Sequence, residues 1–341
     1  MYSPKNVLIT GAAGFIGSHA AILLVKKYGN IKFIGLDKIS YCSNIKNISE
    51  INNNLNFKFI QGDICEADFM RFIFKEYKID TVIHFAAYSH VDHSFGNSLI
   101  FTKNNVVGTH TLLEAAKEAN VNRFIHVSTD EVYGDQDGIS HEGTMIDPTN
   151  PYSASKAAAE QIVKGYYHSF KLPIIITRGN NVYGSFQYPE KAIPRFCLRL
   201  LNGQKCQIQG DGSQTRSFMY VLDVARAFET ILFKGKIGEI YNISSQKEYA
   251  IKDVAEMLVN SVTFGEEDDD VNKYIEYVKD RDFNDQRYNI NGDKLRSLGW
   301  DQETTFDEGL KLTLEWYKTN QNYWNNDELG GALECDNRII N

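Results

Sequence analysis

The chain has 341 residues, of which 43% are hydrophobic and 23% charged, and its formal net charge is −8. This composition excludes a disordered, collagen-like or coiled-coil chain, and the length allows about two domains with a proper hydrophobic core. An acidic chain is a poor general binder of nucleic acid or anionic membranes, so we expect neither as a partner. Small phosphorylated ligands remain possible, because a local positive pocket can hold them.

The cysteine pattern and the start of the chain indicate a cytoplasmic protein. The number of cysteines is odd and none forms a CxxC pair, which favours free thiols in a reducing compartment. The first residues, MYSPKN, lack the basic and apolar regions of a signal peptide. The stretch 7–25 has the length of a membrane span. Glycines interrupt it, however, and its two halves differ in type, so we expect a strand followed by a helix.

Apolar runs alternate with helical patterns in the first half of the chain. The runs predict strands at 6–10, 32–36, 57–60, 81–87, 124–128 and 173–178. Helical patterns between them include 68–77 and 107–119, and Pro151 opens another helix after Asn150. This alternation predicts an α/β fold with a doubly wound, Rossmann-type parallel sheet that helices cover on both faces.

The alternation loosens after residue 180. The patterns there predict a helix at 189–201, a strand that runs into a helix at 216–232, a strand at 239–244 and a helix at 306–317. We therefore expect a dinucleotide-binding domain at 1–180 and a smaller mixed α/β substrate-binding lobe at 181–325. Some strands of the second part are expected to return to the first domain, and 326–341 is expected to be a tail.

A glycine pattern marks the expected cofactor site. Gly11, Gly14 and Gly17 follow the first strand and open a helix, and Asp37 ends the second strand twenty residues after Gly17. Such glycines let backbone amides approach a pyrophosphate at the helix N-terminus. A carboxylate at Asp37 binds ribose hydroxyls and repels a 2′-phosphate, so NAD is favoured over NADP. The alternative is a glycine-rich turn in an unrelated α/β protein.

Other candidate cofactor contacts lie at the ends of neighbouring strands. Asp63 fits a hydrogen bond to the adenine amine, although it can equally be an ordinary turn aspartate. The residues at 85–87 end the fourth strand, where a cofactor backbone can lie close. The predicted cofactor contacts are completed by Phe15, Ile16, Lys38, Ile64, Phe85, Ala86, Ala87 and Asn104.

Catalytic candidates cluster after the fifth strand and at the start of the helix from 151. Tyr152 and Lys156 are four residues apart and so share a helix face, where the lysine can lower the pKa of the tyrosine and hold the nicotinamide ribose. A tyrosinate there is a base for a hydroxyl whose carbon loses hydride. A surface Tyr/Lys pair is the alternative.

Two adjacent carboxylates, Asp130 and Glu131, follow Thr129 at the end of the fifth strand. Ligands bind at this edge of doubly wound sheets. In extended backbone adjacent side chains diverge, so the pair can address two different substrate atoms. The alternative is a pair of solvated loop acids.

These segments resemble the extended short-chain dehydrogenase/reductase family, and STDEVYG at 128–134 resembles its nucleotide-sugar 4,6-dehydratases. Segments such as AAYSHVDHSFGNS, NPYSASKAAAE, TRGNNVYG and YPEKAIPRF extend the resemblance over about residues 5–320. They look most like the UDP-glucose 4,6-dehydratase domain of plant-type rhamnose synthases, with dTDP-glucose as the alternative substrate. An epimerase or a decarboxylase is opposed by Asp130, and a non-catalytic NAD-binding regulator would not need the catalytic set.

The resemblance implies roles for the catalytic candidates and a resident NAD. Tyr152 and Thr129 act at the C4 hydroxyl, Glu131 is the base at C5, and Asp130 is the acid for the C6 hydroxyl. Arginines suit a diphosphate because they bind it bidentately. The implied substrate contacts, besides Thr129, are Ser89, Asn181, Lys191, Gln207, Gln209, Arg216 and Arg281.

Three further expectations complete the sequence analysis. The resemblance implies a homodimer through helices near 97–119 and 151–170. Tyr88 departs from the glutamate or glutamine of similar proteins, and Asn104 from threonine, which bears on the cofactor side. The histidines show no metal-ligand spacing, so no metal is expected, and a pair of His90 and Asp92 is expected to support the cofactor loop.

Overall fold

The computed structural model describes residues 2–136, 138–263, 270–280, 285–324 and 331–334. Its main sheet has seven parallel strands in the order β10-β6-β5-β4-β1-β2-β3. This order confirms the doubly wound class, because it reverses between β1 and β4. The strands are β1 (Asn6–Thr10), β2 (Lys32–Asp37), β3 (Phe57–Gln61), β4 (Thr81–His84), β5 (Arg123–Thr129), β6 (Ile174–Gly179) and β10 (Ile240–Ile243).

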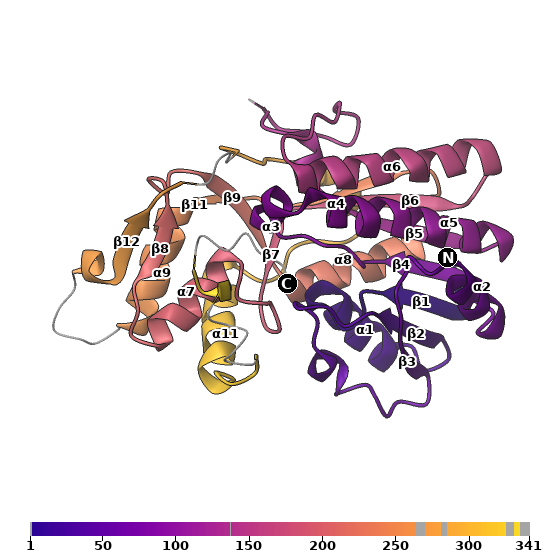
Figure 1. The fold of residues 1–341 in the computed structure, drawn as a ribbon, viewed down its shortest axis with the longest axis horizontal. Helices are drawn as coiled ribbons and strands as arrows, with labels where there is room; N and C mark the ends of the chain where they lie inside the picture. Colours follow the sequence, from indigo (N-terminus) through magenta and orange to yellow (C-terminus); the bar gives the residue numbers. More distant parts are fainter. Residues whose placement is uncertain (1, 137, 264–269, 281–284, 325–330, 335–341) are drawn as a thin grey trace.

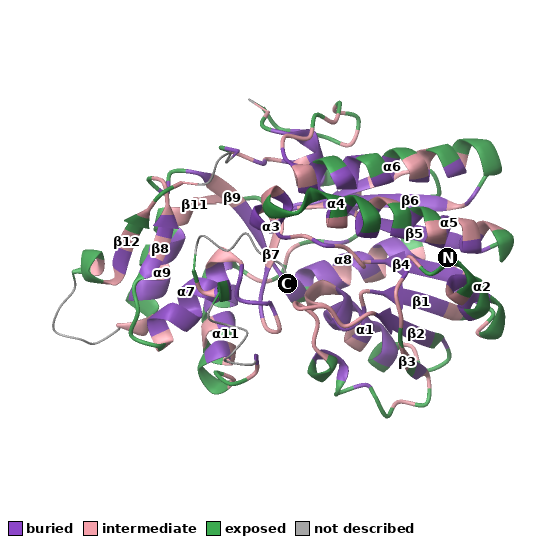
Figure 2. Ribbon diagram, in the orientation of Figure 1, coloured by how far each residue is buried: buried purple, intermediate pink, exposed green. Residues whose placement is uncertain are grey.

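Helices cover both faces of this sheet (Figure 1). Successive strand residues point to opposite faces, so Val7 and Ile9 enter one core while Leu8 enters the other. Figure 2 shows the strands buried between the layers and the outer faces of the helices exposed. One face carries α1 (Phe15–Lys27), α8 (Val221–Lys234) and α10 (Asp293–Arg296), and the other carries α2 (Ala67–Glu76), α5 (Gly108–Glu118) and α6 (Pro151–Phe170).

The second lobe has two small sheets and its own core (Figure 1). Although α8 and β10 come after residue 180, β10 pairs with β6 and α8 packs on α1, so both lie with the main sheet. The boundary expected at 180 stays a prediction. The elements of the lobe are β7 (Asn181–Tyr183), β9 (Thr215–Tyr220) and β11 (Glu248–Ala250), β8 (Cys206–Gln209) and β12 (Ile275–Val278), and α7 (Ala192–Leu201), α9 (Ile251–Val262) and α11 (Phe306–Thr319).

The remaining short elements are helical. They are η1 (Ile45–Ile48), α3 (Val91–Gly96), α4 (Ser98–Phe101), the π-helical segment η2 (Thr102–Val107), η3 (Asp130–Tyr133) and η4 (Val271–Tyr274). Of the predicted tail at 326–341, the structure describes residues 331–334.

Some predicted boundaries are wrong for a physical reason. The strand expected at 81–87 ends at His84, because its partner β1 ends at Thr10 and turns into the glycine segment. The helix expected from Pro189 begins at Ala192. The apolar stretch 7–25 divides into β1 and α1, as expected. Within the described residues no helix has both the length and the apolarity needed to cross a membrane.

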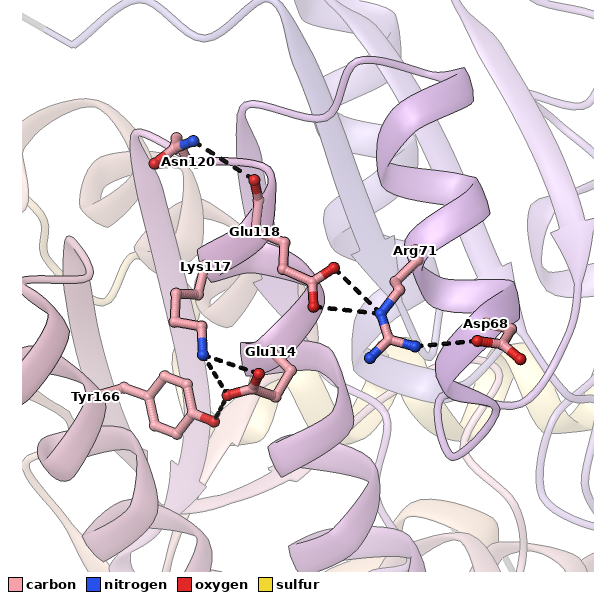
Figure 3. A network of polar contacts seen from close by, with 7 residues as sticks. All are labelled: Asp68, Arg71, Glu114, Lys117, Glu118, Asn120 and Tyr166. Carbon is pink, nitrogen blue, oxygen red and sulfur yellow. Dashed lines mark hydrogen bonds and ion pairs between the residues drawn. The ribbon is translucent and has the colours of Figure 1, made fainter.

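Polar contacts on the outer surface connect α2, α5 and α6 (Figure 3). The Arg71 side chain of α2 donates to both carboxylate oxygens of Glu118 in α5, at 3.2 and 3.1 Å. Glu114 of α5 accepts from Lys117 at 2.7 Å and from the hydroxyl of Tyr166 in α6. The Arg71 and Glu118 side chains are nearly half exposed, so solvent screens this pair and its contribution to stability is small.

A buried ion pair connects α6 to β6. The Arg178 guanidinium donates to Glu160 through Nε at 3.0 Å and Nη2 at 2.6 Å, and both side chains are at most 1% exposed. The guanidinium also lies 4.6 Å from the centre of the Tyr133 ring. Because water cannot replace either partner, each charge depends on the other. This pair fixes the helix that carries Tyr152 against the strand that leads to Asn180.

The buried and the exposed ion pair are expected to respond differently to mutation. We expect Glu160→Ala to lower the free energy of unfolding by about 3–5 kcal/mol, because it leaves the Arg178 charge buried alone. Glu118→Ala, the matched exposed control, should cost less than about 1 kcal/mol. Urea unfolding of both variants measures the difference. Equal losses would contradict this interpretation, and Glu160→Ala with Arg178→Met should recover part of the stability.

Candidate functional site

The glycine turn joins β1 to α1 with no room for larger residues. Gly11 has φ +69°, and a Cβ there would lie 2.8 Å from the Ala86 nitrogen, while a Cβ on Gly17 would overlap the Gly11 carbonyl oxygen. Gly14 is the N-cap of α1 and offers no side-chain cap. The first amides of α1 therefore keep their donors for another acceptor, which fits a pyrophosphate at this helix end.

Acidic groups and one lysine follow β2 and β3. The buried Asp37 carboxylate accepts from the amides of Ala13 at 3.1 Å and Ile39 at 2.8 Å. Burial raises the pKa of Asp37, although these amides oppose the effect. Burial also tends to raise the pKa of Asp63, but the Cys65 amide and Lys38 outweigh it, and the pKa is lowered. Both carboxylates line the same cavity and can accept hydrogen bonds from hydroxyl or amine groups.

The π-helical segment η2 supports this end of the site. It directs both Asn104 and Asn105 inward, and both are buried. Asn104 accepts from Lys38 at 2.7 Å, whereas the Asn105 amide bonds the backbone of Tyr88 at 2.8 and 2.9 Å and the Ser155 hydroxyl at 2.9 Å. One π-turn thereby ties the loop after β4 to helix α6, as such turns often do at functional sites.

Tyr88, the residue that departs from the similar proteins, lines the same cavity as Lys38 and Asn104. Its ring lies 4.5 Å from the Lys38 ammonium, a cation–π contact, and it packs against Phe101 and Tyr152 in one buried cluster. Tyr88 thus takes a packing role between the expected adenosine side and the catalytic helix.

A single cavity brings together every residue predicted to contact the cofactor. Phe85, Ala86 and Ala87 form part of its wall, next to the glycine turn. Its lining includes Gly11, Gly14, Phe15, Ile16, Gly17, Asp37, Lys38, Asp63, Ile64, Phe85, Ala86, Ala87, Asn104, Tyr152 and Lys156. The cradle around the glycines and the free amides of α1 fit a dinucleotide.

Helix α6 begins at this cavity with a complete cap. The Asn150 side chain accepts from the Ser153 amide at 2.9 Å, and the Ser153 hydroxyl pairs with the Asn150 backbone, so both free helix-end groups are satisfied. Tyr152 and Lys156 lie on the first turns and are 7% and 5% exposed. The cap therefore sets the position of the catalytic pair.

The Lys156 ammonium bonds the end of β5, and the expected lowering of the Tyr152 pKa by this lysine stays a prediction. Burial and the nearby Glu131 raise the pKa of Tyr152, and the Lys156 ammonium donates to the Val127 carbonyl at 2.6 Å. Burial also lowers the pKa of Lys156 to about 8.

The two adjacent carboxylates diverge, although not through extended backbone. They begin the 3₁₀ turn η3, which Thr129 caps by accepting from the Glu131 amide at 3.3 Å. Asp130 accepts from Asn180 Nδ2 at 2.7 Å, and Glu131 accepts from Asn150 Nδ2 at 3.2 Å. The expectation of extended backbone is wrong, because the chain must turn at the end of β5.

Their environments separate the two acids. Burial, with the Glu131 charge next, raises the pKa of Asp130 to about 7. Burial also raises the pKa of Glu131, but Lys191, Asn150 and Arg216 stabilise its charged form. Asp130 therefore holds a proton near neutral pH, at which Glu131 is more easily ionised.

A second cavity adjoins the first and contains the predicted substrate contacts. Tyr152 and Ser89 line both cavities, so the two are continuous at the catalytic helix. Asp130 does not line the second cavity; its carboxylate lies behind Thr129 and Asn180. Arg281 lies outside the described residues. The predicted residues that line this cavity are Ser89, Thr129, Glu131, Tyr152, Asn181, Lys191, Gln207, Gln209 and Arg216.

Two cations of this cavity are held by backbone carbonyls. Lys191 donates to the Ser89 carbonyl at 2.8 Å. The Arg216 guanidinium donates to the carbonyls of Thr215 and Asp285, both at 2.8 Å, and lies 4.7 Å from the centre of the Tyr288 ring. These carbonyls orient the two cations, whose charges also stabilise the ionised form of Glu131.

Three residues of the site were missed by the sequence analysis. Asn150 and Asn180 are the partners of the two acids, and Asp285 accepts from the Thr149 hydroxyl at 2.9 and 2.8 Å on the same cavity wall. Asn150 begins the NPYSASKAAAE segment and Asn180 lies in the TRGNNVYG segment, so each is close in sequence to a predicted site residue. Nothing in the local sequence shows that their side chains point at carboxylates from β5.

His84 and His90 are both buried near the site. His84 is bonded to Thr10 at 2.7 Å and to Thr109 at 2.9 Å, and burial lowers its pKa to about 3. The expected His90–Asp92 pair is 3.9 Å apart, at the edge of the α3 turn. Within the described residues, Cys42, Cys65, Cys197 and Cys206 are free thiols, and Cys335 lies outside them.

Comparisons with known proteins agree with this geometry. The GDP-mannose 4,6 dehydratase family profile matches residues 8–313. A trifunctional UDP-glucose 4,6-dehydratase/UDP-4-keto-6-deoxy-D-glucose 3,5-epimerase/UDP-4-keto-L-rhamnose-reductase of Arabidopsis thaliana is 51% identical over 99% of this chain and 50% of that protein. This chain thus spans about half the length of the plant relatives.

Two further comparisons involve dTDP-glucose 4,6-dehydratases. The human protein is 48% identical over 95% of this chain and 93% of its own length. The crystal structure of the Streptomyces venezuelae protein, solved with NAD bound, is 36% identical and has a TM-score of 0.89, covering 94% of this chain and 99% of that one. The family match, the identities and the shared fold confirm the resemblance, and the chain belongs to the GDP-mannose 4,6 dehydratase family of extended short-chain dehydrogenase/reductase proteins.

Proposed function

We propose that this chain is an NAD-dependent nucleotide-sugar 4,6-dehydratase, a hydro-lyase. One observation carries the proposal: Tyr152 borders both cavities, while Glu131 lines the second and Asp130, whose pKa is about 7, lies directly behind it. The site thus combines a base for a hydroxyl proton, a base for a carbon-bound proton and a protonated acid. This combination suits an oxidation followed by loss of water. The relatives named above carry the same activity in their names.

The cofactor cavity has the features that NAD requires. When NAD is bound, the amides of α1 would hold the pyrophosphate, Asp37 would accept from the adenosine ribose, and Lys156 would hold the nicotinamide ribose. NAD bound in this way would store the hydride released at carbon 4 of the sugar until it is needed at carbon 6. No second reductant is consumed, so the protein gains from holding NAD tightly.

The residues of β5 and α6 carry the proton transfers. Tyr152 removes the proton of the C4 hydroxyl, and Thr129 hydrogen-bonds the same oxygen. The ketone formed at C4 acidifies the C5 proton, which Glu131 accepts in its ionised form. Asp130 gives its proton, by way of the Thr129 hydroxyl, to the C6 hydroxyl, which leaves as water. Reduction at C6 and return of a proton to C5 complete the 4-keto-6-deoxy sugar.

Asp130 can serve as the acid from its buried position because Thr129 is a hydroxyl. Thr129 Oγ1 lies 3.2 Å from Asp130 Oδ1 and borders the cavity itself. A hydroxyl both donates and accepts, so it can stay bonded to the carboxyl group in either protonation state. Asn180 holds the other carboxyl oxygen and fixes its orientation.

The substrate we propose is UDP-glucose. The support is the 51% identity to the plant UDP-glucose enzymes over nearly the whole chain, together with the RGNNVYG and SFGNS segments. Lys191 and Arg216 suit the diphosphate, and Gln207 and Gln209 of β8 suit the base. dTDP-glucose is the second candidate, favoured by the 48% identity of the human dTDP-glucose 4,6-dehydratase.

The function is tested by incubating the purified protein with either sugar nucleotide in heavy water and no added NAD. Loss of water with deuterium incorporated at C5, followed by mass spectrometry and NMR, is expected with UDP-glucose and at a lower rate with dTDP-glucose. If neither sugar loses water even with NAD supplied, the 4,6-dehydratase proposal fails. A non-catalytic NAD-binding regulator would then be the better interpretation.

We further propose a cytoplasmic homodimer. Its contact would use the surface of α4, η2, α5 and α6, where Leu99, Val107 and Phe170 are exposed. Exposed apolar side chains on neighbouring helices are typical of a contact surface. Sedimentation of the full chain tests the oligomeric state, and Val107→Glu should shift it to the monomer.

Amide substitutions separate the roles of the two acids. We expect Asp130→Asn and Glu131→Gln each to lower product formation by about 10²–10⁴-fold, because each removes one proton-transfer group. Asp130→Asn should retain deuterium exchange at C5, whereas Glu131→Gln should lose it. Bound NAD, measured after denaturation, should stay equal to wild type in both. An unchanged rate in either variant contradicts the assigned role.

The pKa of Asp130 predicts the alkaline side of the pH profile. Asp130 must carry a proton to act, and its pKa is about 7, so its active fraction falls as the pH rises through that value. We expect the rate of water loss to fall roughly tenfold per pH unit above that point. C5 exchange in the Asp130→Asn variant is the control and should show no such fall. A wild-type rate that stays constant up to ~pH 9 would exclude Asp130 as the acid.

A further inference from the structure

Three buried side chains beside the substrate cavity form a cluster that the proposed reaction does not use. His90 precedes α3, His93 lies within it, and Glu190 precedes α7. They are 7%, 3% and 6% exposed. One donor atom of each lies within 4.8 Å of those of the other two. The cluster therefore brings two imidazoles and a carboxylate from both lobes to one point.

Three side-chain atoms of the cluster lack a hydrogen-bond partner among the described residues. Neither ring nitrogen of His93 has a hydrogen-bond partner within the described part of the chain, and no donor there bonds Glu190 Oε2. All three atoms are buried. Burying such groups without a partner costs about 1–3 kcal/mol each, so the arrangement calls for a further ligand.

The spacing is close to that of a coordinated ion. Three atoms all within 4.8 Å of one another have a common point no more than about 2.8 Å from each, and Zn–N and Zn–O bonds are about 2.0–2.2 Å. Side-chain movements of less than about 1 Å would close the difference. Two histidines and one glutamate are also a donor set that zinc uses.

The charges around the cluster permit a divalent cation. The Asp92 carboxylate lies 3.9 Å from His90 Nε2, and Glu190 is a second acid. The Tyr41 hydroxyl hydrogen-bonds Glu190, and the positive charge of the Lys191 ammonium acts on both Glu190 and His93. When Glu190 is ionised, the charges of Asp92, Glu190 and Lys191 sum to −1. A divalent cation at this point would therefore be attracted by the local charge.

We propose that His90, His93 and Glu190 form a binding site for a divalent transition-metal ion of the zinc type. The site would act as a structural clip, because it joins α3 of the cofactor side to the start of α7 in the substrate lobe. Ser89 and Lys191, which bond each other at 2.8 Å, are the direct neighbours of two of its ligands. The bound ion would keep Ser89 and Lys191 in fixed positions at the substrate cavity. It would take no part in the chemistry.

Sequence spacing gave the opposite expectation, that no metal binds. His90 and His93 are three residues apart, but Glu190 comes about a hundred residues later, and only the packing of α3 against the segment before α7 brings it near. Local motifs cannot show a ligand contributed by another lobe.

The test is Co²⁺ binding by the full-length protein after chelator treatment and dialysis. We expect one equivalent of Co²⁺ to bind with the visible absorption of a four-coordinate site, and one equivalent of Zn²⁺ to displace it. His93→Asn should weaken binding at least about tenfold, since it removes one ligand. His110→Asn, which removes an exposed histidine of α5, is the matched control and should bind as wild type.

Two results would overturn the proposal: no stoichiometric Co²⁺ uptake by wild type, or equal uptake by wild type and His93→Asn. Glu190→Gln provides a second ligand variant if His93→Asn does not fold, and circular dichroism with NAD content checks folding of each. Because binding is measured directly, a failed dehydratase assay and a failed metal titration remain distinguishable.

Discussion

The buried ion pair between Glu160 and Arg178 is the contact on which the geometry of the site depends. It fastens α6, whose first turns carry Tyr152 and Lys156, to β6, whose end leads to Asn180. Asn180 in turn holds Asp130. A charge without water is costly unless it is fully paired, so neither element can slide along the other without separating the pair. The ion pair therefore fixes the position of Tyr152 relative to Asp130, although neither Glu160 nor Arg178 lines the two cavities.

The sequence predicted the cofactor half of the site better than the catalytic half. The glycine turn, Asp37 and the strand ends are local patterns, and local patterns are set by backbone sterics and the helix terminus. The main-sheet strands were likewise found to within a few residues, except at β4, where the end depends on its partner β1. The partners Asn150 and Asn180, and the turn of η3, depend on contacts between distant segments. No periodicity or spacing reports such contacts.

Burial sets the protonation of the site more than charge pairing does. It raises the pKa values of Asp130, Glu131 and Tyr152 and lowers that of Lys156. Burial therefore shifts each of these groups toward its neutral form. The two acids differ because Glu131 faces the cations of the substrate cavity while Asp130 faces an amide. The substrate side thus selects which of two adjacent carboxyl groups becomes the base.

The path of the chain between the lobes has a consequence for biosynthesis. After β6 the chain enters the second lobe, returns to cover the main sheet with α8 and adds β10 at its edge, then leaves again. During translation from the N-terminus, the sheet stays one strand short until Ile243 has left the ribosome, and the apolar face that α8 covers stays open until Lys234 has emerged. The main sheet can therefore be complete only after a segment that is synthesised later than the first strands of the substrate lobe.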